Sequence, residues 1–337
     1  MNVVLIIPTG IGCEIGGHAG DANPVAKLIG SCCDFLFLHP NVVNASDINE
    51  MPENALYIEG SILDRFLEEK IELQRVKQNK VLVVANSPVH NETINAVSAA
   101  RVTLGLEAEI LTLEEPLIMH AYMKDGKASG EVHNWTNLVD QVIDYDFDAL
   151  AIATPIDMEK ELELNYWENG GVNPWGGVEA MASKLIANKI NKPVAHAPVC
   201  IGNKQEESDM VCDPRDGAEI ISWAFLHCVL KGLQKAPRIC KWHTGYGHGL
   251  SVSDIDVMIS PHGCWGRPHD ACFIRGIPIL EVMENKTIYS KRKVTEVPEH
   301  YTIQVKNYWE AAGYIMTMQA GIHPLSVRRP LEPTKVT

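Results

Sequence analysis

The stretch Val3-Val4-Leu5-Ile6-Ile7-Pro8-Thr9-Gly10 opens with five apolar residues and ends in a proline, a threonine and a glycine. An apolar run without polar alternation is typical of a strand that is covered on both faces. Proline has no N–H to offer a neighbouring strand, so it ends the pairing. The stretch therefore predicts a first strand that stops at Pro8 and leads into a loop.

The rest of the chain alternates between strand and helix patterns. Similar apolar runs lie at residues 35–38, 81–85, 110–113, 149–153, 257–259 and 277–282. Helical patterns lie between them at residues 25–30, 58–67, 92–104, 137–143, 177–190, 216–233 and 308–319. Asn23-Pro24 predicts a helix N-cap followed by proline at the first helical position. This alternation indicates an α/β fold with mainly parallel sheets flanked by helices.

The 337 residues suffice for one large domain or two ordinary ones. Lys124-Asp125-Gly126-Lys127 predicts an exposed turn. The turn is either a hairpin within a single α/β unit, residues 1–337, or a boundary between two lobes. The lobes would then be a glycine-loop lobe, 1–125, and a Cys/His-loop lobe, 130–337.

Composition limits the partners and the compartment. The net charge of −14 disfavours nucleic acid and anionic membranes, because phosphate binding needs a cationic surface. No apolar run approaches the roughly 20 residues that span a bilayer, and the N-terminus lacks the basic region of a signal peptide. Nine cysteines without framework spacing suggest reduced thiols. We therefore expect a cytoplasmic protein, or an organellar one if a leader has been removed.

Prolines recur at the ends of the predicted strands. The pairs are Ile7-Pro8, His39-Pro40, Ser87-Pro88, Thr154-Pro155, Ala197-Pro198 and Ser260-Pro261. In open α/β sheets, ligands bind outside the carboxyl ends of the strands. Polar and glycine residues follow most of these prolines, so we expect the site at the carboxyl ends, although proline also ends strands that bind nothing.

A glycine-rich loop follows the first strand, from Gly10 to Asp21. It is suited to an anion, because glycines let backbone N–H groups turn toward a ligand. The spacing of Gly10, Gly12 and Gly16 misses the dinucleotide fingerprint by one residue. We expect Thr9, Gly10, Gly12 and Gly17 to bind substrate, and His18 and Asp21 to act as an acid/base or metal-ligand pair. The alternative is a loop that only shapes a turn.

Two further polar segments follow strand ends. The first offers Asn41, Asn44 and Asp47 as substrate-binding residues, with a ligand-free loop of Asx-turns as the competing interpretation. The second offers Asp157, followed by Gly170-Gly171-Val172-Asn173-Pro174-Trp175-Gly176-Gly177 and a helix that carries Glu179. Its Trp175 would serve as a lid over a pocket or would fill the core.

Cysteine and histidine concentrate near the C-terminal third. Seven of the chain's 22 Cys and His residues lie between Cys240 and Cys272, among them His243 and His248. The spacing does not match a structural zinc site. Cys264 is a candidate nucleophile with His262 or His269 beside it, and Arg267 and Arg275 are candidate anion binders. The alternatives are an inert buried thiol and surface salt bridges.

Several of these stretches together resemble a family of cyanobacteria and plants that is defined by a domain of unknown function. They are Ile7-Pro8-Thr9-Gly10-Ile11-Gly12, Gly16-Gly17-His18-Ala19-Gly20-Asp21-Ala22, His39-Pro40-Asn41-Val42-Val43-Asn44-Ala45-Ser46-Asp47 and Ser260-Pro261-His262-Gly263-Cys264-Trp265-Gly266-Arg267-Pro268-His269. The resemblance covers nearly the whole chain and implies a cytosolic or plastid location. It brings no reaction and no catalytic residues.

The leading hypothesis is an enzyme acting on a small anionic metabolite by proton transfer or thiol chemistry, as a lyase, isomerase or hydrolase. Its expected catalytic residues are His18, Asp21, His262, Cys264 and His269. Of these, His18, Asp21, His262 and Cys264 should surround one pocket. A divalent metal ion bound by His18, Asp21, His262 and His269 is the second hypothesis. A nicotinamide-dependent oxidoreductase and a non-catalytic assembly or regulatory protein are further alternatives, and the apolar residues 311–320 predict either a homo-oligomer contact or ordinary core.

Overall fold

The larger sheet contains six parallel strands in the order β17-β16-β15-β1-β2-β5. A computed structural model describes residues 1–46, 48–199, 213–215, 217–220, 224–241, 249–290 and 301–336. The strands of this sheet are β1 (Asn2–Leu5), β2 (Phe35–Leu38), β5 (Ala55–Tyr57), β15 (Val257–Pro261), β16 (Ile279–Val282) and β17 (Thr302–Val305). The two ends of the chain thus build one sheet.

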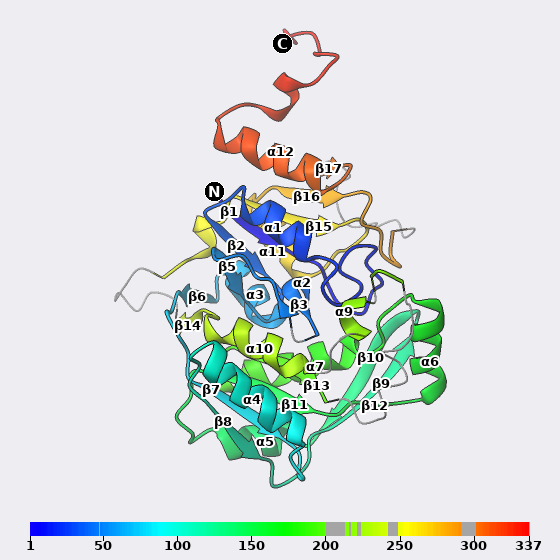
Figure 1. The fold of residues 1–337 in the computed structure, drawn as a ribbon. Helices are drawn as coiled ribbons and strands as arrows, with labels where there is room; N and C mark the ends of the chain where they lie inside the picture. Colours follow the sequence, from blue (N-terminus) through cyan, green and yellow to red (C-terminus); the bar gives the residue numbers. More distant parts are fainter. Residues whose placement is uncertain are drawn as a thin grey trace.

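The smaller sheet has four parallel strands in the order β13-β11-β7-β8. They are β7 (Val81–Ala85), β8 (Ala108–Thr112), β11 (Ala149–Thr154) and β13 (Val194–Pro198). All four lie between β5 and β15 in the sequence, so this sheet is an insertion into the larger one. Figure 1 shows the larger sheet above the smaller, with the C-terminal segment projecting beyond the last helix.

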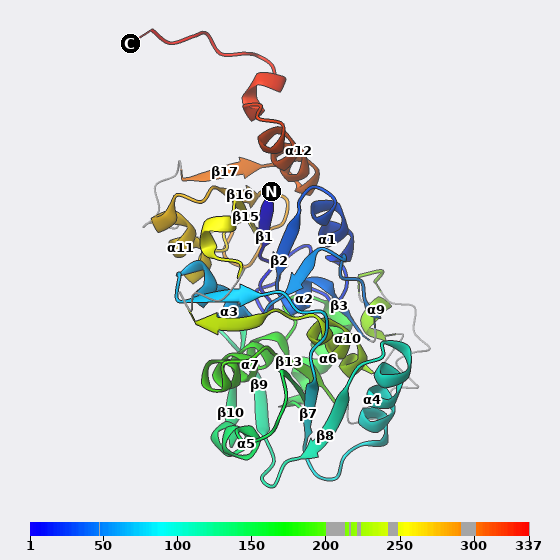
Figure 2. The ribbon, with the colours of Figure 1, turned by 90° about the vertical axis from the view of Figure 1, so that its left-hand side faces the viewer.

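Helices cover both faces of both sheets, which explains why the strands are apolar throughout. Side chains of α1 (Asn23–Gly30), α4 (Asn91–Thr103), α10 (Phe225–Gln234) and α12 (Tyr308–Gln319) contribute to one buried cluster. Side chains of α3 (Gly60–Leu67), α5 (Trp135–Val142), α7 (Gly176–Ile190) and α11 (Arg267–Arg275) contribute to the other. Val3 and Val83 lie in the first cluster, and Val4 and Val84 in the second. Each cluster therefore joins both sheets. Figure 2 shows α1, α3 and α11 beside the larger sheet, and α4, α5 and α7 beside the smaller one.

Shorter elements complete the fold. They are α2 (Pro40–Val43), β3 (Asn44–Ala45), β4 (Ile48–Asn49), β6 (Ile71–Gln74), β9 (Ile118–Lys124), β10 (Lys127–His133), β12 (Asp157–Met158), α6 (Lys160–Asn169), α9 (Gly217–Ile220), β14 (Arg238–Lys241) and the 3-10 turns η1 (Val252–Asp254) and η2 (Pro324–Val327). The predicted turn after Lys124 is the tip of the antiparallel β9–β10 hairpin.

The order of strands reverses direction once in each sheet. From β1 the chain proceeds to β2 and β5 on one side, and the later strands β15 to β17 lie on the other. From β7 it proceeds to β8 on one side, while β11 and β13 lie on the other. Such a switch point opens a crevice at the carboxyl ends of its two central strands, where ligands bind in α/β proteins.

The α/β class with parallel sheets is confirmed, but one detail of the prediction is wrong. The N-cap of α1 is Ala22, not Asn23, and no side chain caps this helix. The backbone N–H of Asn23 donates to the Gly20 carbonyl, which draws Asn23 into the first turn. Of the apolar C-terminal residues, Ala311 and Ile315 are buried in the core. A homo-oligomer stays a prediction.

Candidate functional site

A cavity of about 820 Å³ lies where the carboxyl ends of strands from both sheets meet. Residues at or after the ends of six strands line it: Thr9 after β1, Asn41 after β2, Glu59 after β5, Asn86 after β7, Asp157 after β11 and Val199 after β13. Four of the six strand-ending prolines also line it, namely Pro8, Pro40, Pro155 and Pro198. The cavity thus occupies the crevice of the smaller sheet and faces the larger one.

Glu179 and His196 form a pair on one wall of the cavity. Glu179 lies in the first turn of α7, and His196 lies within β13. His196 Nδ1 is 3.1 Å from Glu179 Oε1. The His196 side chain is 1% exposed and that of Glu179 is 26% exposed. The Glu179 carboxylate is therefore the more accessible of the two groups, and the buried imidazole holds it in place through their contact.

The start of α7 is held tightly against the hairpin and the β1 loop. A Cβ atom on Gly177 would lie 2.4 Å from the carbonyl carbon of Ala128, and one on Gly176 would lie 2.0 Å from Thr9 Oγ1. Only glycine permits this approach. The close contact fixes the position of Glu179, which follows two residues later on the helix.

The surroundings of His196 satisfy two proton states of its ring. Its Nε2 lies 3.3 Å from Thr154 Oγ1 and 3.2 Å from the Thr154 carbonyl oxygen. In the neutral ring, Nδ1–H donates to Glu179 and Nε2 accepts from the threonine hydroxyl. In the charged ring, Nε2–H donates to the carbonyl instead. Neither state leaves a buried nitrogen without a partner, which suits a proton-transfer pair.

A second acid/base system includes His18, Tyr166 and Glu219. The Tyr166 hydroxyl lies 3.0 Å from His18 Nδ1 and donates to Glu219 Oε2 at 3.3 Å. The other carboxylate oxygen, Oε1, accepts from the Ala19 N–H at 2.6 Å. All three side chains are buried, and His18 and Glu219 line the cavity. The order is consistent with a proton relay from His18 through Tyr166 to Glu219.

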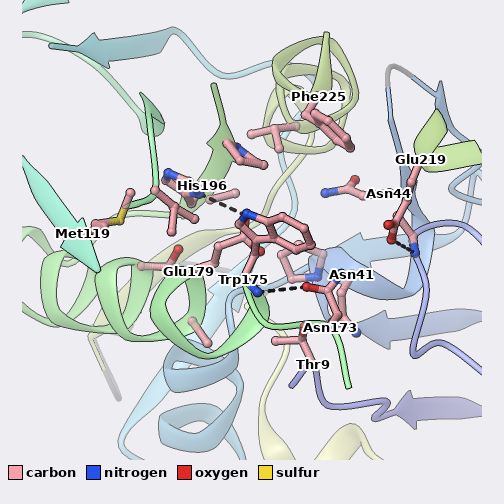
Figure 3. A pocket seen from close by; sticks show the side chains of 18 of the residues that line it. Thr9, Asn41, Asn44, Met119, Asn173, Trp175, Glu179, His196, Glu219 and Phe225 are labelled. Atoms are coloured by element: carbon pink, nitrogen blue, oxygen red, sulfur yellow. Dashed lines mark hydrogen bonds and ion pairs between the residues drawn. The ribbon is translucent and has the colours of Figure 1, made fainter. Parts of the chain in front are cut away.

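An aromatic group separates the two systems. The rings of Trp167 and Trp175 have centroids 5.7 Å apart, and both pack edge-on against Tyr166. Figure 3 shows Glu179 and His196 on one side of Trp175, and Glu219 and Asn44 on the other. Trp175 is half-buried and lines the cavity, so it provides an apolar surface against which a ligand can stack.

The charged groups on the lining are mainly acidic. Besides Glu179 and Glu219, they include Glu59, Asp157 and Glu163. Glu59 caps α3 by accepting from Ser61 N and Ile62 N, and burial raises the pKa of its carboxyl group. Within the described ranges, no lysine or arginine lines the cavity.

The structure brings six of the fifteen predicted site residues to the cavity. Those on its lining are Thr9, Gly17, His18, Asn41, Asn44 and Asp157. Two of them also have scaffold contacts: the Asn41 amide donates to the Ile7 carbonyl, and the Asn44 amide donates to the Tyr57 hydroxyl. Gly10 and Gly12 are absent from the lining, and Asp47 lies outside the described residues.

The predicted Cys/His loop lies apart from this cavity. His262 pairs with Glu281 at 2.7 Å, and His269 Nε2 lies 2.9 Å from Ser260 Oγ. Burial lowers the pKa of His269 to about 4 and raises that of Cys264 to about 12. A thiol nucleophile needs a lowered pKa, so this environment does not favour the thiolate. His243 and His248 lie outside the described residues.

The two predicted anion-binding arginines join α11 to α3. Arg267 forms two hydrogen bonds of 2.8 Å with the Glu68 carboxylate and a 3.3 Å ion pair with Asp64. Arg275 donates to the Leu67 and Glu68 carbonyl oxygens and pairs with Glu69. Through these contacts the two arginines hold α11 against α3 and the turn after it, and neither side chain lines the cavity.

Asp21 also has a local role, since it accepts from the Gly16 N–H within its own loop. Burial raises the pKa of Cys13 well above its usual range, and neighbouring Cys264 and Asp21 add to this rise; none of these three side chains lies on the cavity lining. In the part of the chain that the structure describes, no group of three or more His, Cys, Asp or Glu side chains is arranged to hold a metal ion.

The sequence prediction missed His196, Tyr166 and Glu219. A signal for His196 is present in Val194-Ala195-His196-Ala197, where a histidine interrupts an apolar strand pattern. Tyr166 and Glu219 carry no comparable signal, because their helices are short and their partner, His18, is far away in the sequence.

Comparison with known proteins identifies relatives but no reaction. Residues 2–328 match a family model described as a protein of unknown function, DUF3326. The chain is 34% identical over 343 residues to the "Uncharacterized lipoprotein syc1174_c" of Synechococcus sp., covering 97% of this chain and 93% of that protein. No solved structure gives a significant match. Among the described residues, no helix is both long and apolar enough to cross a membrane.

Proposed function

This chain belongs to the DUF3326 family of proteins of unknown function, and we propose that it is an enzyme that transfers protons on a small polar metabolite. The observation that carries the proposal is the Glu179–His196 pair on the cavity wall. A half-accessible carboxylate backed by a buried imidazole is a common form of general acid/base group.

In this proposal Glu179 contacts the substrate and takes up or releases the proton. His196 is a positioning residue that holds the Glu179 carboxylate and balances its charge. His18, Tyr166 and Glu219 would supply the complementary proton on the far side of Trp175. Two acid/base systems facing one cavity are the arrangement that isomerases and lyases need to move a proton between two positions of a substrate.

The proposal does not require an anionic substrate. Arg267 and Arg275, which the sequence offered as anion binders, pair instead with carboxylates of α3 and of the turn that follows it. An added Cβ atom would lie 3.0 Å from Ala128 on Gly10 and 3.0 Å from Val172 on Gly12, and neither glycine lies on the cavity lining, so no observation of the described loop favours a nicotinamide cofactor.

The test is a metabolite screen. Purified protein is incubated with a cell extract, and changes are followed by mass spectrometry. We expect the wild type to convert at least one metabolite, and Glu179→Gln to lower that rate by about 10²-fold or more. Arg267→Ala, which is distant from the cavity lining, is the control and should keep the rate. No conversion by the wild type, or an unchanged rate in Glu179→Gln, would contradict the proposal.

We further propose a cytoplasmic location. The seven cysteines that the structure describes are all free thiols, as in reducing compartments. The cyanobacterial relative is named a lipoprotein, which suggests membrane attachment as the competing location. Fractionation of native cells distinguishes the two: recovery of the full-length chain with membranes would contradict the cytoplasmic proposal.

A further inference from the structure

The cavity is lined twice by a tryptophan and a glutamate that lie one helical turn apart. Glu163 and Trp167 both belong to α6. Trp175 is the N-cap of α7, and its carbonyl oxygen accepts from the Glu179 N–H at 3.2 Å. Residues four apart on a helix are neighbours on the same face. All four residues line the cavity, so each of the two neighbouring tryptophans is accompanied there by a carboxylate.

The lining carries more negative than positive charge in every proton state of its histidines. Its carboxylates are those of Glu59, Asp157, Glu163, Glu179 and Glu219. Burial lowers the pKa of His39 to about 4, so its ring is neutral at pH 7. None of the lysines and arginines in the described part of the chain lies on the lining. Even with Glu59 neutral and with His18 and His196 both charged, carboxylates outnumber cations.

Glu163 contributes a charge that the protein itself does not compensate. Each of the other four lining carboxylates has at least one hydrogen-bond partner in the protein. Among the described residues, no hydrogen bond or ion pair reaches the half-buried Glu163 side chain. Withdrawing a charge from water without pairing it raises the free energy of the folded state. A cation that binds beside Glu163 would remove this cost.

The faces of Trp167 and Trp175 add a second attraction for positive charge. The face of an aromatic ring is electron-rich, and tryptophan attracts a cation more strongly than phenylalanine or tyrosine does. Both side chains are half-buried and line the cavity, so part of each indole is accessible from it. Their ring centroids are 5.7 Å apart and their planes are inclined by 48°. The two rings therefore form adjoining walls against which one small cation can lie.

We propose that the cavity binds a small organic cation with a protonated amino or guanidinium group, which lies against Trp167 and Trp175 and pairs with Glu163. The carboxylates would repel an anion, and a neutral ligand would leave the Glu163 charge uncompensated. A volume of about 820 Å³ is ample for a small metabolite. The inference rests on the proposed enzymatic function, because it names the substrate class of the same cavity.

The sequence beyond the described lining has the same charge balance. Residues 200–212, which lie outside the described ranges, follow Val199 on the lining. They contain three acidic residues and one lysine. The excess of negative charge therefore extends to the segment that continues from the cavity.

Binding is tested by calorimetry at neutral pH with four probes that share a four-carbon chain. Putrescine and agmatine are the cations, 1,4-butanediol is the neutral counterpart of putrescine, and succinate is the anionic one. We expect at least one cation to bind the wild type about tenfold or more tightly than either counterpart, because the carboxylates and the ring faces both attract positive charge.

Binding in the cavity must be distinguished from binding elsewhere on a chain with a net charge of −14. Glu163→Gln removes one lining charge and should weaken cation binding by about tenfold. Asp157→Asn neutralises a second lining carboxylate and should also weaken it, so the test does not depend on one variant. Glu168→Gln removes an exposed charge of the same helix that is not on the lining, and should bind as the wild type does.

NMR supplies a second, independent measurement of where the cation binds. The indole N–H signal of Trp175, assigned with Trp175→Phe, should shift when the cation is added. Four results would overturn the proposal: no preference for the cations, unchanged binding in both lining variants, an equal loss in Glu168→Gln, or cation binding that leaves the Trp175 signal unmoved.

These outcomes can be separated from failure of the proposed function. If turnover in the metabolite screen depends on Glu179 but the cations are not preferred, the ligand class is wrong and the function stands. If a cation binds as expected but the wild type converts no metabolite, the cavity is a cation-binding site and the enzymatic function is wrong.

Discussion

The Glu179 carboxylate lies 3.1 Å from Nδ1 of His196, whose side chain is only 1% exposed. The pair joins the first turn of α7 to β13, an edge strand of the smaller sheet, so it contributes to folding as well as to the proposed chemistry. If the buried imidazole loses its acceptor, its N–H group is left without a hydrogen bond, and the folded state is destabilised by the full desolvation free energy of that group.

Replacing Glu179 by alanine should therefore destabilise the protein. We expect Glu179→Ala to lower the free energy of unfolding by about 1–3 kcal/mol, and Glu179→Gln to lower it by less than about 1 kcal/mol, because the amide oxygen still accepts from His196. Urea unfolding measures both. Glu163→Ala, on the same cavity lining but without a described hydrogen bond, should change stability by no more than about 0.5 kcal/mol. Equal losses for Ala and Gln would show that the hydrogen bond is not the cause.

The close packing at the start of α7 leads to a second prediction. A Cβ atom on Gly177 would lie 2.4 Å from the Ala128 carbonyl carbon, and backbone cannot yield as a flexible side chain can. Gly177→Ala should therefore cost about 1–3 kcal/mol or more of stability. Gly313→Ala in α12 is the matched control, since nothing lies within 4 Å of its added Cβ. It should be neutral or stabilising by up to about 1 kcal/mol, as helix propensity favours alanine. Equal effects of the two substitutions would contradict the close contact.

The sequence predicted the strands well because most are covered on both faces. Residues 81–85, all apolar, form β7 without error, and all five are buried. The β9–β10 hairpin was predicted only as one of two alternatives, because its strands are not apolar throughout: in Ile118–Lys124 buried residues alternate with partly exposed ones. Prolines at strand ends marked the position of the cavity, since four of them lie on its lining at the carboxyl ends of the strands.

Sequence reasoning could not decide which polar residues face the cavity. Arg267 and His18 are both polar residues near strand ends, yet Arg267 pairs with Glu68 just after α3, whereas His18 contacts Tyr166. That difference depends on which helices pack together, and partners more than 100 residues apart cannot be paired from local pattern. For the same reason the sequence could not show that the Cys and His residues near Cys264 lie apart from the cavity, where His262 and His269 contact Glu281 and Ser260 of the larger sheet.

The protein should lose stability as the pH falls from 6.5 toward 4. Burial holds the pKa of His269 at about 4, below its ordinary 6.5. Between these two pH values the unfolded chain therefore binds a proton that the folded chain does not bind. Burial also lowers the pKa of His39 to about 4, so two histidines contribute to this loss. Each contribution is complete above pH 6.5 and is lost progressively down to pH 4, by about 3 kcal/mol per histidine. His269→Gln should therefore reduce the slope of this part of the profile in urea unfolding by about half. A slope identical to that of the wild type would show that His269 does not control it.

Cys264 should be an unreactive thiol in the folded protein. Burial raises its pKa to about 12, so at pH 8 the thiolate fraction is about 10⁻⁴. Treatment of the native protein with iodoacetamide, followed by peptide mass spectrometry, should leave Cys264 unmodified, whereas the urea-unfolded chain should be labelled throughout. Cys264→Ser should also keep any activity found in the metabolite screen. Rapid labelling of native Cys264, or loss of that activity in Cys264→Ser, would restore thiol chemistry as the mechanism and move the active centre to the loop after β15.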